Sequence, residues 1–203
     1  MSKILLISII AAISLSACSK KTVPQIPAST PEVMVRPLSK MKMRDTFPYS
    51  WVGLWEGNLE IYNAKGLSQT LPMQLDLDET ETAGVFKWNI IYGTDREKGL
   101  RPYLLRTLDA SKGLYQNDEV NTIKMEAYYI GGRLFSTFSV QGNLLTSIQE
   151  KKGDEMHWEI IFGKDTPVSI TGNQVVKGDT ISEVKTMPVL INQRAILKRK
   201  VQP

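Results

Sequence analysis

Cysteine and histidine each occur only once in the 203-residue sequence, as Cys18 and His157. A single thiol cannot form a disulfide within the chain, so the fold must be stabilised by packing. A single imidazole cannot supply the pair of histidines that many zinc sites use, and no His-x-x-His or His-Glu-x-x-His spacing occurs. No Gly-x-Ser-x-Gly nucleophile elbow is present either. We therefore expect no metal, no cofactor and no enzymatic activity.

An excess of one charge is also lacking. The chain has 25 Lys and Arg against 21 Asp and Glu, a net charge of +4. Its basic residues are scattered, apart from Lys198-Arg199-Lys200 at the carboxyl end, so we expect no nucleic acid partner. Adjacent carboxylates such as Asp118 and Glu119 fall in expected turns, where they are expected to be solvated. General acid and base catalysis would require one of them to be desolvated.

The start of the chain carries an apolar run over residues 4–17 that only serines interrupt. This run is shorter than the roughly 20 residues that a membrane-spanning helix needs, and it is typical of a signal peptide. It ends in Leu15-Ser16-Ala17-Cys18, which resembles the lipobox of bacterial lipoproteins. The resemblance implies that residues 1–17 are removed and that the sulfur of Cys18 receives a lipid that anchors the chain to a membrane. The alternative is an ordinary signal peptide followed by an unmodified, buried Cys18.

The remaining chain divides by composition into two parts. Residues 18–45 contain four prolines and few large apolar side chains, which is typical of a disordered tether. Residues 46–203 show a regular series of short apolar runs, which is typical of one folded domain. In a cell with two membranes, the resemblance to lipoproteins also implies a location. The serine after Cys18 favours the outer membrane. A periplasmic domain and a surface-exposed domain both fit the sequence.

Residues 46–203 consist of short runs rich in β-branched and aromatic residues, separated by turn residues such as Gly131-Gly132. No long stretch of helical periodicity separates these runs. The pattern predicts an all-β fold, a single antiparallel barrel of about 8–10 strands. A short helix or turn is expected near residues 47–52, and residues 166–187 fit either two short strands or a long loop over one barrel mouth. The expected strands cover residues 51–62, 69–77, 84–92, 101–108, 122–130, 134–140, 144–149, 156–162 and 189–199.

Alternation of apolar and polar residues indicates which side chains face the barrel interior. In the first expected strand, Trp55, Leu59 and Ile61 alternate with three polar residues, so these three are expected to point inward. His157 alternates with Trp158 and is therefore expected on the outside. That position disfavours a role for His157 as a haem ligand of the kind found in nitrobindin-like barrels.

Gly53-Leu54-Trp55, at the start of the first expected strand, is similar to the Gly-x-Trp signature of lipocalins and related calycin barrels. The resemblance implies that Trp55 closes one end of the barrel and packs under an arginine of the last strand, a cation over an aromatic face. Arg194 is the expected partner, with Arg199 as the alternative. The strand count and Trp55-x-Gly57 would suit a fatty-acid-binding-protein-like or nitrobindin-like barrel equally well. The fold class expected is thus a lipocalin-like barrel.

A barrel of this size either fills its interior with side chains or encloses one small apolar ligand. Two functions follow for an envelope lipoprotein. In the first, the barrel binds a small hydrophobic ligand. In the second, the core is packed and the barrel surface binds another envelope protein, as a structural or assembly partner. The residues expected to line a ligand cavity are Phe86, Trp88, Ile90, Tyr92, Phe138, Trp158, Ile160 and Phe162.

The assignment of Cys18 predicts the behaviour of a Cys18→Ala variant. Without the thiol there is no site for the lipid, so we expect the variant to move from the membrane fraction to the soluble fraction of lysed cells. Cell fractionation and immunoblotting measure this. A Cys18→Ala variant that stays fully membrane-bound would contradict the lipobox assignment.

Overall fold

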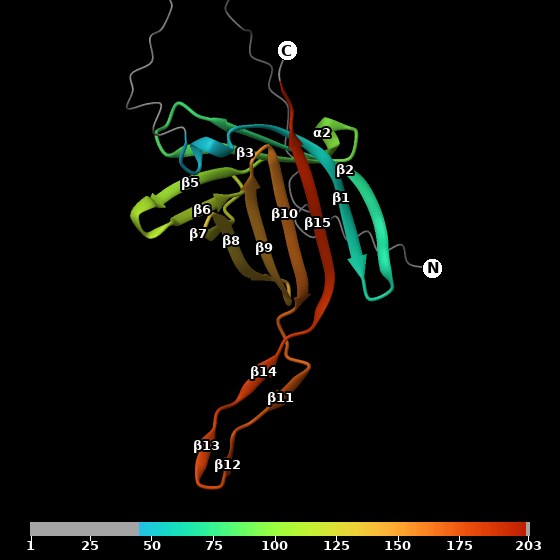
Figure 1. Cartoon of the computed structure of the whole chain (residues 1–203), viewed down its shortest axis with the longest axis vertical. Helices are drawn as coiled ribbons and strands as arrows, with labels where there is room; N and C mark the ends of the chain where they lie inside the picture. The colour runs from blue at the N-terminus through green and yellow to red at the C-terminus, as the bar shows by residue number, and fades with distance from the viewer. Residues whose placement is uncertain (1–44, 202–203) are drawn as a thin grey trace, which may run out of the picture. The chain divides into compact units, whose positions relative to one another are not determined.

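Residues 45–201 are described by the computed structural model, and the predicted signal peptide, Cys18 and the predicted tether up to residue 44 lie outside the described residues. The described strands form a closed antiparallel barrel of ten strands, which confirms the all-β barrel predicted from the sequence (Figure 1). Its strands are β1 (Gly53–Asn63), β2 (Gly66–Glu79), β3 (Val85–Tyr92), β5 (Leu104–Asp109), β6 (Leu114–Asp118), β7 (Lys124–Ile130), β8 (Arg133–Val140), β9 (Asn143–Lys152), β10 (Glu155–Lys164) and β15 (Val189–Arg199).

Strands that follow one another in the chain are neighbours almost everywhere in the barrel. From β1 to β10 each strand pairs antiparallel with the next, and β4 (Leu100–Arg101) is a short piece that pairs with β3 ahead of β5. The barrel closes because β15 pairs with β10 on one side and with β1 on the other. Such closure leaves no sheet edge exposed around the barrel.

The alternation in the sequence is realised in the sheet. Trp55, Leu59 and Ile61 of β1 are buried, whereas Asn58 between them is exposed. Paired residues on neighbouring strands share a face, so Trp55 lies beside Leu75 and the core runs continuously from strand to strand. A shift of one residue would turn each apolar set outward, which is why the pattern specifies the register.

Two parts of the fold differ from the strand list predicted from the sequence. Strand β6 was not expected, because within it Gln116, Asn117 and Asp118 are polar and only Tyr115 is a large buried side chain. The ambiguous segment at residues 166–187 forms neither two strands nor a long loop. It contains four short strands: β11 (Ser169–Thr171), β12 (Gln174–Val176), β13 (Asp179–Ile181) and β14 (Val184–Thr186).

These four strands form a two-stranded ribbon, which we call the arm (residues 168–186). Strand β11 pairs with β14, and β12 pairs with β13 (Figure 1). Gly172 and Asn173 have positive φ angles between the two paired sections. All four strands are exposed along their whole length. The arm connects β10 to β15, and it exposes Val168, Ile170, Val175, Val176, Ile181 and Val184.

The helices are short. Besides α2 (Arg96–Gly99) there are the 3-10 turns η1 (Tyr49–Trp51) and η2 (Ala110–Lys112), and η1 confirms the short helix or turn expected near residues 47–52. Within residues 45–201, no helix has the length and apolar character needed to cross a membrane.

Aromatic residues around η1 seal one end of the barrel, which we call the capped end. The ring of Phe47 stacks on Tyr129 with a centroid distance of 4.2 Å, and it meets Trp51 edge-on at 4.7 Å and Tyr115 edge-on at 4.9 Å. Phe47 and Trp51 are buried. Aromatic pairs in these geometries add to the energy of burial, so the segment before β1 is held against the strands.

Arg199 joins the last strand to this cap. Its guanidinium lies 4.1 Å from the centroid of the Trp55 ring, and Nη1 and Nη2 donate to the backbone carbonyls of Val52 and Ser50 at 2.6 and 3.1 Å. Trp55 is fully buried, and its Nε1 donates to the carbonyl of Trp51 at 2.9 Å. The pair therefore links β15, β1 and η1 at one point.

Gly53 leaves the space that this arginine occupies. A Cβ at position 53 would lie 2.6 Å from Nη1 of Arg199, and the φ of Gly53 is +143°, a conformation that other residues rarely adopt. The Gly-x-Trp pattern thus has a local physical reason. Glycine admits the guanidinium, and tryptophan provides the face on which it lies.

Arg194, the partner expected for Trp55, does not occupy this position. Its guanidinium lies 4.4 Å from the ring centroid of Tyr62, and it donates to the Tyr62 hydroxyl at 2.9 Å. The register explains this correction, because Arg199 is directly opposite Trp55 and Arg194 is opposite Glu60, which faces outward. Arg199, the alternative, is the arginine over Trp55.

We expect Arg199→Met to lower the free energy of unfolding by about 2 kcal/mol or more. The change removes the cation over Trp55 and leaves two carbonyls of the cap without their donor. Urea unfolding followed by tryptophan fluorescence measures the effect. Arg194→Met, on the exposed outer face, is the matched control and should change stability much less. Equal losses for both variants would contradict the role assigned to Arg199.

Candidate functional site

The exposure of inward-facing side chains changes from one end of the barrel to the other. At and next to the capped end five of them are completely buried, with 0% of their surface exposed. These residues are Trp55, Leu75, Leu134, Met156 and Leu197. Side chains packed to this degree leave no room for a ligand.

At the opposite end, several inward-facing residues keep part of their surface accessible, beside others, such as Phe162, that are buried. We call this end the mouth, and we define it by Leu71, Tyr92, Tyr103, Met125, Phe138, Ile160 and Ile191. Tyr92 and Phe138 lie near the ends of β3 and β8, and Met125 and Ile191 lie near the starts of β7 and β15, so they belong to the same end of the barrel. The mouth therefore offers an apolar surface that solvent, or a ligand, can reach.

The residues predicted to line a cavity fall into two groups. Tyr92, Phe138 and Ile160 belong to the mouth. The other five are buried, at between 3% and 7% exposure, and four of these belong to the continuous core. They are Phe86, Trp88, Ile90 and Trp158 in the core, together with Phe162. The structure thus brings three of the eight to an accessible surface and buries the other five, of which Phe162 lies beside the mouth residue Ile191.

Polar groups are buried inside the barrel, between the level of Leu134 and that of the mouth residue Ile160. Ser136, Ser147 and Gln149 face inward from β8 and β9 and are at most 9% exposed. Trp158, which pairs with Gln149, has an Nε1 that forms no hydrogen bond within the described part of the chain, and the same is true of Oδ1 of Asn117. Burying such an atom without a partner costs about 1–3 kcal/mol, so each one calls for an explanation, such as a bound molecule.

A cluster of charged and phenolic side chains lies in the wall of the mouth. The Tyr103 hydroxyl donates to Oε1 of Glu119 at 3.2 Å, and the Asn121 amide donates to Oε2 of Glu119 at 3.1 Å. Arg101 is partly exposed and pairs with Ile90 in the sheet, which places it on the inward face. The charge of Arg101 acts on both Tyr92 and Tyr103.

Burial keeps these two phenols protonated. It raises the pKa of Tyr92 to about 12, against a smaller lowering by Arg101. Burial also raises the pKa of Tyr103, and the carboxylate of Glu119 raises it further. Both hydroxyls therefore remain hydrogen-bond donors at neutral pH.

Asp118 and Glu119 correct the expectation that adjacent carboxylates in turns are solvated. Both are buried, at 6% and 8% exposure. The N–H of Val120 and the guanidinium of Arg106, each 2.9 Å from a carboxylate oxygen of Asp118, lower the pKa of Asp118. Asp118 therefore has a structural role on the outward face, and Glu119 faces the mouth.

Sequence reasoning missed Arg101 and Glu119 as site residues. Arg101-Pro102-Tyr103 breaks the alternation between β4 and β5. A break of this kind is a local signal that could have drawn attention to the segment. Nothing local distinguishes Glu119 from a solvated turn residue, because only the contact with Tyr103, between β4 and β5, places it inside.

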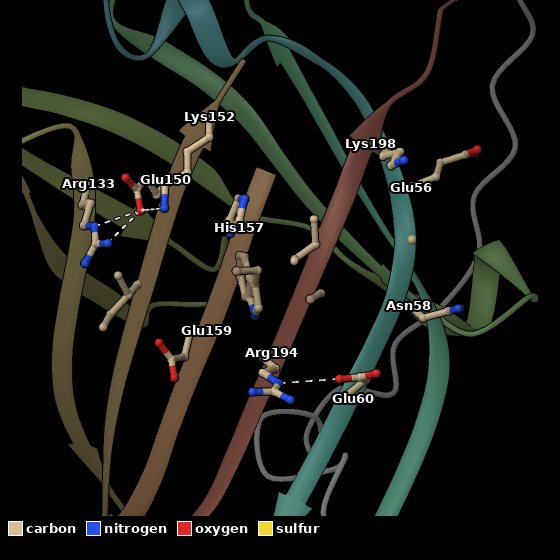
Figure 2. A pocket seen from close by; sticks show the side chains of 15 residues that line it. Glu56, Asn58, Glu60, Arg133, Glu150, Lys152, His157, Glu159, Arg194 and Lys198 are labelled. Carbon is tan, nitrogen blue, oxygen red and sulfur yellow. Dashed lines mark hydrogen bonds and ion pairs between the residues drawn. The ribbon is translucent and has the colours of Figure 1, made fainter. Parts of the chain in front are cut away.

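A second feature lies on the outside of the barrel. A groove of about 730 Å³ crosses β1, β15, β10, β9 and β8, and charged side chains point into it (Figure 2). Glu150 binds Arg133 at 2.8 Å and Lys152 at 3.1 Å, and Glu60 lies 3.5 Å from Arg194. Opposite charges therefore compensate one another across this face, which is typical of a solvated surface.

His157 belongs to this outer face, as expected, with Nε2 3.2 Å from Oε2 of Glu155. Within residues 45–201, no three His, Cys, Asp or Glu side chains are grouped so that they could hold a metal ion. In the comparisons with known proteins, no family model matched the chain, and no curated protein matched it either. The candidate site therefore stands on its geometry alone.

The contrast between the two ends predicts different costs for truncating two residues of β8. Leu134→Ala, at the capped end, should lower the free energy of unfolding by about 2–5 kcal/mol, because it leaves a cavity in a closed core. Phe138→Ala, at the mouth, should cost no more than about 1–2 kcal/mol, since its ring is already partly exposed. Urea unfolding of both variants measures this, and an equal or larger loss for Phe138→Ala would mean that the interior is packed throughout.

Proposed function

We propose that the protein is a lipid-anchored lipoprotein of the bacterial cell envelope, attached through Cys18, whose barrel holds a small apolar ligand in the mouth. The observation that carries the ligand is the group of partly exposed apolar side chains at the mouth, which contrasts with completely buried residues nearer the cap such as Trp55 and Leu134. The unpartnered Nε1 of Trp158 and Oδ1 of Asn117 support it, because a bound molecule can satisfy such atoms. The anchor is supported by the lipobox of the sequence.

Binding to another envelope protein through the barrel surface is the second candidate. The arm favours it, since the arm exposes six β-branched apolar side chains along two short paired sections. An isolated two-stranded ribbon is marginally stable in water, and exposed apolar patches often mark protein contacts. Native mass spectrometry distinguishes the two candidates, because a small bound molecule and a partner protein differ in mass.

The full chain carrying Cys18→Ala, purified from the original host, is the sample for the test, so that its own acyl chains cannot enter the mouth. Native mass spectrometry before and after extraction with organic solvent should show a small excess mass that extraction removes. The extracted protein should then bind an apolar fluorescent probe. A clean protein mass, together with no binding of the probe, would contradict the proposal.

Two adjacent residues of β15 give a matched pair of variants. Ile191 is partly buried in the mouth, and Leu190 is exposed. Ile191→Arg places a charge where the apolar ligand would lie, so we expect it to weaken binding of the probe by about tenfold or more. Leu190→Arg should bind like the unchanged protein. Equal binding by both variants would place the ligand elsewhere.

A further inference from the structure

The arm, residues 168–186, has two open sheet edges. Its strands form two-stranded sheets, so within the described residues each of the four strands has a neighbour on one side only. A ribbon of two strands is marginally stable in water, and its open edges are templates for pairing with a further strand. The arm is therefore a place where another strand can add to the sheet.

The two edges of the arm differ in continuity. On the edge formed by β11 and β12, Gly172 and Asn173 have positive φ angles of 78° and 54°, which interrupt the extended chain. On the edge formed by β13 and β14, residues 179–186 have no positive φ angle, and all of them are exposed. This second edge, which we call the arm edge (residues 179–186), is the longer template for a partner strand.

The charges of the arm are balanced. It carries Lys177 and Lys185 against Asp179 and Glu183, so no excess charge attracts an anionic lipid surface. Insertion into the hydrocarbon of a bilayer is also disfavoured, because the open edges would leave backbone groups without hydrogen bonds there. A strand of a protein is therefore the occupant that suits the arm edge.

The charge pattern of the arm edge is complementary to a second copy of itself. Glu183 and Lys185 lie on either side of Val184 in the chain, and their side chains form an ion pair of 3.1 Å. When two arm edges pair antiparallel with Val184 opposite Val184, Glu183 of each copy lies opposite Lys185 of the other. Opposite charges that face each other across strands stabilise a sheet, and this register provides two such pairs.

Other symmetric registers of the arm edge match its charges less well. Two identical strands related by a twofold axis pair about one residue, which lies opposite its own copy. Pairing about Glu183 or about Lys185 sets like charges opposite each other, which is destabilising. Pairing about Ser182 sets the charge of Glu183 opposite the apolar Ile181. The pattern therefore favours pairing about Val184.

We propose that the arm edge binds a second copy of this chain, in an antiparallel pair centred on Val184. The two ribbons then form one four-stranded sheet, in which β13 and β14 of both copies are inner strands. Val184, which is 56% exposed in the single chain, is covered by its copy. This inference goes beyond the proposed function and does not depend on it, since no mouth residue belongs to the arm.

The test uses a full chain with a single thiol. Cys18→Ala removes the only cysteine, so Val184→Cys in that background introduces a unique one. The contact is small compared with the roughly 1,200 Å² of a stable interface, so we expect a weak dimer that a covalent bond can trap. In the proposed register the two thiols are close enough for a disulfide, which oxidised glutathione forms and non-reducing electrophoresis detects.

Val175→Cys is the matched control, because Val175 is an exposed valine of the arm that lies on the other edge. Dividing each rate by the rate of reaction with a small disulfide corrects for differences in thiol reactivity. We expect Val184→Cys to form the covalent dimer about fivefold faster or more. Equal rates would indicate random collision and overturn the proposal, and a faster reaction of Ser182→Cys would overturn the register.

Reversing the charges tests the recognition itself. In the Val184→Cys chain, either Lys185→Glu or Glu183→Lys alone sets like charges opposite each other, so each should slow the cross-link about fivefold or more. An equal mixture of these two variants should restore it as mixed dimers, which mass spectrometry identifies, and circular dichroism checks that each variant folds. Single variants that cross-link at the original rate, or a mixture that does not recover, would overturn the charge-matched pairing.

Discussion

The pairing of β1 with β15 is the constraint on which the rest of this structure depends. It joins strands that are far apart in the chain and removes the last open edge of the barrel, so that an interior exists at all. It also sets Arg199 opposite Trp55. The guanidinium over that ring and its two bonds to the cap fix the segment before β1 in place. Gly53 completes this arrangement by leaving the space that the guanidinium fills.

Sealing one end determines what the other end can do. The aromatic cap of Phe47 and Trp51 is buried and completes a core that contains completely buried side chains such as Trp55. At the mouth the inward residues lack such a cover within the described chain and remain partly exposed. The barrel therefore has a part whose side chains are completely buried and a part with accessible apolar side chains, where we propose that the ligand binds.

The charges of the two faces of the sheet are arranged differently. On the outer face, Glu150 lies between Arg133 and Lys152, and opposite charges within the groove of Figure 2 compensate one another. Inside, Glu119 is satisfied by a phenol and an amide, and within residues 45–201 the guanidinium of Arg101 bonds to backbone carbonyls and to no acid. A partly buried cation gains more from a matching anion than an exposed one does, because fewer water molecules solvate it. For this reason the inner wall is the better candidate for chemical selectivity.

By itself, the sequence was enough to predict the all-β barrel and the inward residues such as Trp55 and Trp158. Alternation with a period of two is a local property, and it follows directly from the pleat of a strand. The lipobox at Cys18 and the tether are likewise local patterns, which stay predictions. Only the tertiary structure decided that Arg199, not Arg194, lies over Trp55 and that Glu119 is buried, because both depend on contacts between residues that are separated in the chain. The same holds for the difference between the capped end and the mouth, since the degree of packing depends on how all the strands and the cap come together.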